Sequence, residues 1–132
     1  MFSKIEINTN KQTEFVDITT QVQKKISQSE ISDGVCVVFV PHTTAGITIN
    51  ENADPDVVQD ILMILNKKIP MGDSGYRHSE GNSAAHIKAS LIGSSVSVIV
   101  ENRKLQLGRW QGIYFCEFDG PRKREIWIKI TG

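Results

Sequence analysis

Alternating and uninterrupted apolar positions predict strands over much of the first fifty residues. Phe2–Ile7 alternates polar and apolar side chains imperfectly, and Glu14–Ile18 is a second short strand-like segment. We predict that these two segments pair as a hairpin across Asn8–Asn10. Val35–Val40 is a β-branched run typical of a buried strand, and Thr43–Asn50 follows it with another strand-like pattern.

Apolar residues with helical spacing predict three helices. The first has an apolar residue at every fourth position, with Thr19 or Thr20 as its N-cap, and stops before Gly34; its apolar positions are Ile18, Val22 and Ile26. The second starts after Asp54, where Pro55 suits the first helical position, and ends before Pro70. It carries a broad apolar face made of Val57, Val58, Ile61, Leu62, Ile64 and Leu65.

The last part of the chain predicts one more helix followed by strands. A glycine-rich loop, Met71–Gly81, leads to a helix that begins at Asn82 or Ser83 and runs to about Leu91. Strands follow, with a turn at Asp119-Gly120-Pro121, over Ser94–Glu101, Leu105–Leu107, Trp110–Phe118 and Arg124–Thr131. This order predicts one α+β domain, residues 1–132, with three helices on a mostly antiparallel sheet or sandwich.

Composition excludes some functional classes. Fifteen basic and fifteen acidic residues cancel, so no strong field favours nucleic acid or anionic lipid. The basic run Pro121–Arg124 is best explained as a solvated hairpin turn. No apolar stretch is long enough to cross a bilayer, and Met1–Asn10 does not have the pattern of a secretory signal. Cys36 and Cys116 lie in apolar runs as buried hydrophobes, which favours a reducing, cytoplasmic location.

Three histidines lie in segments rich in small and polar residues rather than on apolar faces. His42 follows a buried strand, His78 lies in the glycine-rich loop, and His86 lies one helical turn after Asn82. Three imidazoles that face one point match the protein ligands of an open zinc site, with water or substrate in the fourth position. Alternatively, each histidine caps or hydrogen-bonds its own loop, because no HxxxH or HExxH spacing is present.

Two further segments carry candidate site residues. Glu51 follows the strand after His42, and a hairpin would return it near that histidine as a general base or as a partner that fixes a tautomer. A solvated turn explains Glu51 equally well. Arg109 and Trp110 stand between glycines, where an arginine suits a phosphate or carboxylate. The simpler explanation is a strand bulge with a core tryptophan.

Several separated motifs together resemble one family. The run His42–Val57 resembles the signature of the YjbQ family, also called UPF0047. Agreement continues in order through Tyr76–His78, Asn82–Ala89 and Leu105–Gln111, and ends in Glu117–Arg124. Several motifs that agree in order over nearly the whole chain are far more specific than any one of them.

The resemblance implies an α+β fold with a β-sandwich core, assembly as a homotrimer, and a weak, secondary thiamine-phosphate synthase activity. Its motif positions hold the metal-ligand candidates His42, His78 and His86, of which His86 is also expected to be catalytic together with Glu51. The expected ligand-binding residues are Thr43, Thr44, Asn82, Arg109 and Trp110. One departure is that Arg109 stands where threonine is common in the family.

Two classes of function follow from these expectations. In the first, the pocket binds a small phosphorylated molecule and the protein is a transferase or a metal-assisted phosphate-ester hydrolase. A thiamine-phosphate synthase displaces diphosphate from a pyrimidine methyl group by a thiazole nitrogen, and Mg²⁺ would assist the departing group. In the second, the homotrimer is a non-enzymatic module that binds a divalent metal, such as zinc, or a small molecule.

Overall fold

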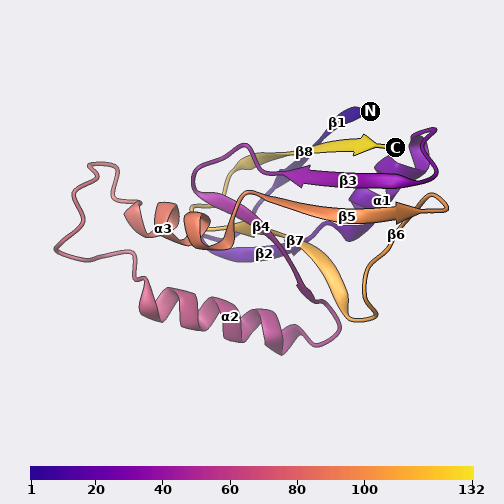
Figure 1. The fold of residues 1–132 in the computed structure, drawn as a ribbon. Coiled ribbons are helices and arrows are strands. Elements are labelled where there is room, and N and C mark those ends of the chain that lie inside the picture. Colours follow the sequence, from indigo (N-terminus) through magenta and orange to yellow (C-terminus); the bar gives the residue numbers. More distant parts are fainter.

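The computed structural model, which describes residues 1–132, contains two antiparallel sheets and three helices (Figure 1). The five-stranded sheet has the order β1 (Phe2–Asn8), β8 (Lys123–Thr131), β3 (Gly34–Phe39), β5 (Ser95–Glu101) and β6 (Lys104–Leu105). The three-stranded sheet has the order β2 (Glu14–Asp17), β7 (Gln111–Glu117) and β4 (Ala45–Glu51). The helices are α1 (Thr19–Gln28), α2 (Pro55–Lys68) and α3 (Ser83–Ile92). The predicted α+β fold with antiparallel sheets and three helices is confirmed.

The main core lies between the two sheets and α1. Alternate side chains of a strand face opposite sides of its sheet, so one set on β8 points inward, namely Ile126, Ile128 and Ile130. Val22 and Ile26 of α1 close the same core. Strand β7 is buried on both faces: Phe115 belongs to this core, and Cys116 belongs to a second cluster under α3.

The predicted hairpin between the first two strands is wrong. β1 pairs with β8 and β2 pairs with β7, so the two strands belong to different sheets. The turn before β8 likewise connects the two sheets, because β7 and β8 are not neighbours in either one. Short loops favour local pairing, but burying the inner faces of both sheets requires the chain to cross between them here.

The helix starts confirm the predictions for α2 and α3 and correct the one for α1. Asp54 caps α2 as expected, since its Oδ1 accepts a hydrogen bond from the Asp56 amide at 2.9 Å. α1 has Ile18, not a threonine, at its N-cap position. The Thr19 hydroxyl instead donates to Asp17 Oδ1 at 2.6 Å. Asn82 occupies the cap position of α3 without making a capping hydrogen bond.

The apolar face predicted for α2 is not buried in the chain. No residue of α2 is fully buried, although Val58 and Leu65 contact the second cluster. α2 is tied to α3 by the buried Lys88, whose Nζ donates to Asn66 Oδ1 at 2.7 Å and whose pKa burial lowers. Amphipathic helices normally bury such a face, but that of α2 is mostly half-buried, and its exposed Ile64, together with Met63, leaves apolar surface available to another molecule.

The cysteines and the helix lengths match the sequence expectations. Cys36 and Cys116 are both buried and unpaired, and burial raises the pKa of Cys36 to about 11, so neither is a ready nucleophile. The longest helix, α2, has 14 residues, and none of the three combines the length and apolar character needed to cross a bilayer.

Candidate functional site

The loop between β3 and β4 joins the two sheets and lies against the junction of α3 and β5. The Val40 amide donates to Ser94 O at 2.8 Å, and the Ile47 amide donates to Gly93 O at 3.0 Å. Gly46 permits this approach, because a Cβ there would lie 2.7 Å from Gly93 O. Both sides of the loop are therefore fixed by backbone hydrogen bonds, and the loop presents its side chains at a defined position.

A cleft of about 350 Å³ opens beside this loop. It is lined by His42 and Thr43 from the loop, by His86 and Ser90 from α3, and by Ser94 and small residues at the junction. Two of the three predicted histidines and Thr43 thus share one cleft. None of the residues that line it is acidic.

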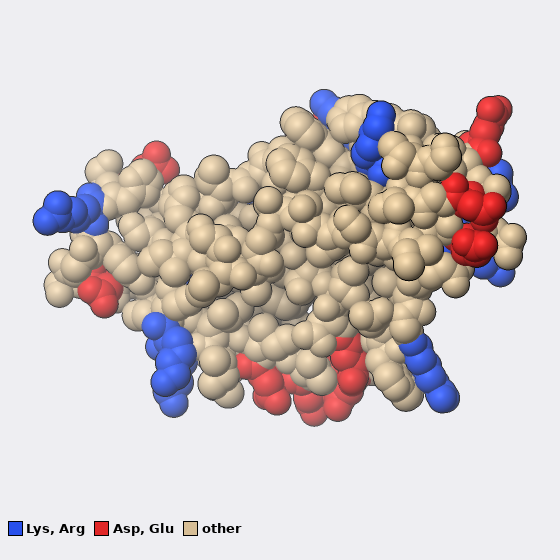
Figure 2. Space-filling view, in the orientation of Figure 1, with Lys and Arg blue, Asp and Glu red and all other residues tan.

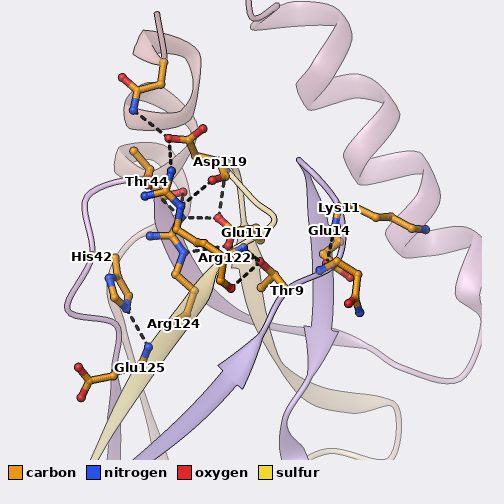
Figure 3. Close-up of polar contacts among 12 residues, drawn as sticks. Thr9, Lys11, Glu14, His42, Thr44, Glu117, Asp119, Arg122, Arg124 and Glu125 are labelled. Atoms are coloured by element: carbon orange, nitrogen blue, oxygen red, sulfur yellow. Dashed lines mark hydrogen bonds and ion pairs between the residues drawn. The ribbon is translucent and has the colours of Figure 1, made fainter. Parts of the chain in front are cut away.

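His42 is held by the neighbouring strand β8. Its Nε2 accepts a hydrogen bond from the Glu125 amide at 2.9 Å, as Figure 3 shows. Burial lowers the pKa of His42, and the positive charge of Arg124 lowers it further. The ring is therefore predominantly neutral at pH 7.

A buried ion pair between Glu117 and Arg124 contacts the same loop through Thr44 (Figure 3). The Arg124 guanidinium donates to both carboxylate oxygens of Glu117 and, at 2.9 Å, to the Thr44 hydroxyl. Glu117 and Arg124 are 0% and 3% exposed. The expectation that the basic run is a solvated turn is wrong for Arg124, whose position on β8 points into the protein. Thr44, a predicted ligand-binding residue, is buried and holds this arginine.

Glu117 is ionised in spite of its burial. Burial alone would raise its pKa, but hydrogen bonds from Arg124, the Asp119 amide and the Thr9 hydroxyl outweigh that effect and lower the pKa below its ordinary value of 4.5. We did not predict this network from the sequence. The signal that could have revealed it is an acidic and a basic residue at inward positions of two strands.

His86 also lines a second cleft, of about 440 Å³, with the glycine-rich loop on its other side. Arg77 and His78 from that loop and Ser83 at the start of α3 line it as well. The His78 and His86 rings lie edge to face, with centroids 5.3 Å apart. Because the first amides of a helix have no partner within it, this end of α3 adds donors beside Arg77 and His78. Glu80 Oε2 lies 3.8 Å from His78 Nε2.

Asn82 connects the start of α3 to the β7–β8 turn. Its Nδ2 donates to Asp119 Oδ2 at 2.8 Å, and Arg122 Nη2 donates to the same oxygen at 3.0 Å. The Asn82 amide nitrogen is therefore engaged within the protein, whereas its Oδ1 is buried without a partner. The predicted ligand-binding residue occupies a place where it orients the helix that carries His86.

The three histidines do not form one metal-binding group within the chain. His42 and His86 share one cleft and His78 and His86 share another, and no three His, Cys, Asp or Glu side chains are arranged to hold a metal ion. A zinc site uses three or four protein ligands. The donor set of the chain does not fit the zinc centre that the sequence led us to expect.

The remaining predicted residues lie at the other end of β4. Glu51 ends the strand that Ala45 begins, about 20 Å away at the usual rise per residue. The adjacent Asn52 amide donates to Trp110 O at 2.9 Å, and the Arg109 guanidinium lies 4.9 Å from the centroid of the Trp110 ring. Trp110 is 54% exposed and is not a core tryptophan. The chain therefore does not bring these three residues to the histidines, because β4 continues straight instead of returning as a hairpin.

Comparisons with known proteins agree with this architecture. Residues 3–132 match the family described as UPF0047 protein YjbQ-like. A UPF0047 protein of Methanocaldococcus jannaschii is 54% identical over 132 residues, which cover 100% of this chain and 95% of that protein. The UPF0047 protein YugU of Bacillus subtilis is 52% identical over 132 residues and is covered completely, as is this chain.

Solved structures show the same fold. A crystal structure of a YjbQ/UPF0047 family protein from Clostridium acetobutylicum has a TM-score of 0.95 and 58% identity, and the match covers 98% of this chain and 99% of that one. A YbjQ-like protein from Sulfolobus solfataricus has a TM-score of 0.94 and 36% identity, with 100% of this chain and 96% of that chain covered. On this evidence the chain belongs to the YjbQ-like UPF0047 family.

Proposed function

We propose that the chain binds a small phosphorylated molecule in the two clefts that share His86 and acts on it weakly, as a secondary thiamine-phosphate synthase. The observation that carries the proposal is the position of His86 between a basic cleft, with Arg77 and His78, and a cleft lined by hydroxyl groups. The phosphoryl oxygens of a phosphate or diphosphate suit both clefts, because each cleft supplies hydrogen-bond donors.

The reaction requires little covalent chemistry from the protein. The thiazole nitrogen attacks the pyrimidine methylene carbon, a C–N bond forms, and the C–O bond to diphosphate breaks with both electrons leaving on the diphosphate. The protein contributes by positioning the two substrates and by stabilising the leaving anion. Arg77, His78 and the start of α3 are placed for the second task. Acidic groups arranged for a magnesium ion are absent from the site, which accounts for a weak activity.

Replacing His86 by alanine tests this assignment. The imidazole makes no side-chain hydrogen bond within the chain, so we expect the variant to remain folded. Hydrogen bonds to a charged group contribute ~1.5–3 kcal/mol, so the dissociation constant for thiamine phosphate should rise about tenfold to a hundredfold. Calorimetric titration measures the affinity, and thermal unfolding measures the fold.

The matched control for that titration is Gln28→Ala, on the far helix α1, which should bind as the wild type does. Unchanged affinity in His86→Ala would contradict the proposal. Incubation with the pyrimidine diphosphate and the thiazole phosphate, followed by detection of thiamine phosphate, tests the reaction itself. Release of inorganic phosphate from simple phosphate esters would identify a hydrolase instead.

A binding module without turnover is the second candidate function. It is favoured by one observation, namely that the clefts supply donors for a phosphate but no group of acidic side chains is arranged to hold the Mg²⁺ that would assist a departing diphosphate. Stoichiometric binding of thiamine phosphate together with no product in the synthase assay would select this function.

We also propose that the chain assembles as a homotrimer. The outer face of the five-stranded sheet has no helix over it and carries exposed apolar side chains. Phe2 and Phe39 pack on Trp127, and Val35 lies directly opposite Ile99. In the view of Figure 2 the charged side chains lie mainly at the margins and most of the surface is uncharged. Exposed apolar side chains of this kind are typical of subunit interfaces. Two lysines stand among them, since Lys4 Nζ lies 5.1 Å from the centroid of the Trp127 ring and Lys129 lies opposite Phe2.

Replacing Ile99 by lysine should disrupt this assembly. Ile99 is 62% exposed in the single chain, so the substitution costs little in the fold but places a charge in the proposed interface. We expect the wild type to have the mass of three chains by size-exclusion chromatography with light scattering, and the variant to shift to one chain. An unchanged mass in the variant would exclude this face, and a monomeric wild type would exclude the trimer.

A further inference from the structure

The hydrogen bond to His42 fixes the position of its proton. A backbone amide is always a donor, so Nε2, which accepts from the Glu125 amide at 2.9 Å, must carry the lone pair. A neutral imidazole has one N–H group and one lone pair. The single hydrogen of the neutral His42 ring therefore lies on Nδ1.

The surroundings of His42 hold its ring in one orientation. The Glu125 amide belongs to β8, where Glu125 pairs with Glu6 of β1 and the pairing with β3 begins two residues later at Trp127, so the donor is held within the sheet. The loop that carries His42 is anchored at Val40 and at Thr44, which accepts from Arg124. Turning the ring to free its lone pair would leave a backbone donor unpaired.

A nitrogen binds a metal ion through its lone pair, and the one lone pair of His42 is already used. His78 and His86 alone are two ligands, fewer than the three or four of a zinc site. The three histidines therefore do not fit a metal centre for two reasons: they are not arranged around one point, and the lone pair of His42 is not available.

We propose that His42 is a fixed hydrogen-bond donor, through Nδ1–H, to a phosphoryl oxygen of the bound molecule, and is not a metal ligand. This inference rests on the proposed function for the identity of the ligand. The cleft that His42 lines contains the Thr43 and Ser94 hydroxyls and no carboxylate, so it supplies donors and suits an acceptor oxygen. The Ser90 hydroxyl, in contrast, already donates to His86 O at 2.9 Å.

Nitrogen-15 NMR of the histidine side chains in the full-length protein at pH 7.5 tests the proton position directly. We expect His42 to give the pattern of the Nδ1–H tautomer, and addition of one equivalent of zinc to leave its resonances unchanged. Addition of thiamine phosphate should shift the His42 Nδ1–H resonance. An Nε2–H tautomer in the free protein, or zinc-induced shifts at His42, would overturn the inference.

Two variants separate the roles of the two ring nitrogens. Asparagine places an amide nitrogen near the position of Nδ1, whereas glutamine reaches the position of Nε2 and is able to accept from Glu125. We expect His42→Gln to bind thiamine phosphate about tenfold more weakly, the contribution of one hydrogen bond, and His42→Asn to stay within about threefold of wild type. The reverse order would overturn the donor role.

The two failures are distinguishable. If neither wild type nor variants bind thiamine phosphate or inorganic phosphate, the proposed function fails, and with it the phosphoryl ligand. The tautomer and the zinc titration are measured without that ligand, so they decide separately whether His42 is held as a donor.

Discussion

Replacing Arg124 by methionine will lower the free energy of unfolding by about 3–5 kcal/mol, the usual cost of removing one partner of a buried ion pair. The Glu117 carboxylate would remain inside the protein with hydrogen bonds only from Thr9 and Asp119. The Thr44 hydroxyl would also lose its donor, and the Thr44 carbonyl would keep only the hydrogen bond from the Phe118 amide. Urea unfolding measures the loss. An unchanged m value, the slope of the free energy of unfolding against urea concentration, would show that the variant unfolds from a compact native state.

The chain supplies a matched control two residues earlier. Arg122 pairs with Asp119 at 3.0 Å, but its side chain is 49% exposed. Replacing Arg122 by methionine should cost less than about 1 kcal/mol, because water competes for exposed pairs. Equal losses in the two variants would mean that burial does not distinguish them, which would contradict the role given to Arg124.

The pH dependence gives a second measure of the same pair. The pKa of Glu117 is lower in the folded chain than its ordinary value of 4.5. A carboxylate with a depressed folded pKa contributes stability above its unfolded pKa and loses it as the pH falls through the folded value. The difference between wild type and Arg124→Met should therefore be largest above about pH 4.5 and shrink at lower pH.

The same pair shows what the sequence was unable to predict. Local patterns identified β3, β4, α2 and α3 to within a few residues, because periodicity and caps depend on neighbouring positions. Arg124 was placed in a solvated turn because three basic residues stand close together in the sequence. The alternation of β8 is a local signal that puts Arg124 on the same face as Ile126, Ile128 and Ile130. Its pairing with Glu117 was not readable from the sequence, because that ion pair joins strands of two different sheets.

The candidate site likewise has features that the sequence predicted and features that it did not. His42 and His86 were identified from their polar surroundings, and the fold does bring them to one cleft. Glu51 was expected beside them from hairpin geometry, but β4 pairs with β7 along its full length and carries Glu51 to the far end. The partner that sets the His42 tautomer is a backbone amide 83 residues away, and a backbone group leaves no mark in a sequence pattern.

A substitution at the buried Phe115 of β7 should have a similarly large effect on stability, unlike one at the exposed Trp110 in the turn before β7. Phe115 is 0% exposed in the main core, opposite Val16 on β2 and Ile47 on β4. Replacing it by alanine removes a buried ring between three strands and leaves a cavity, at a cost of about 3–5 kcal/mol. Differential scanning calorimetry, together with urea unfolding, measures this loss.

Trp110→Ala provides the comparison, because Trp110 is large and apolar but exposed. In the single chain we expect a change within about 0.5 kcal/mol, as for other surface positions. A small loss at Phe115 would mean that the sheet closes over the missing ring, which contradicts a core packed from both neighbouring strands. A loss at Trp110 as large as at Phe115 would mean that Trp110 is covered in solution, and would extend the proposed subunit contacts to the end of β4 that holds Glu51 and Arg109.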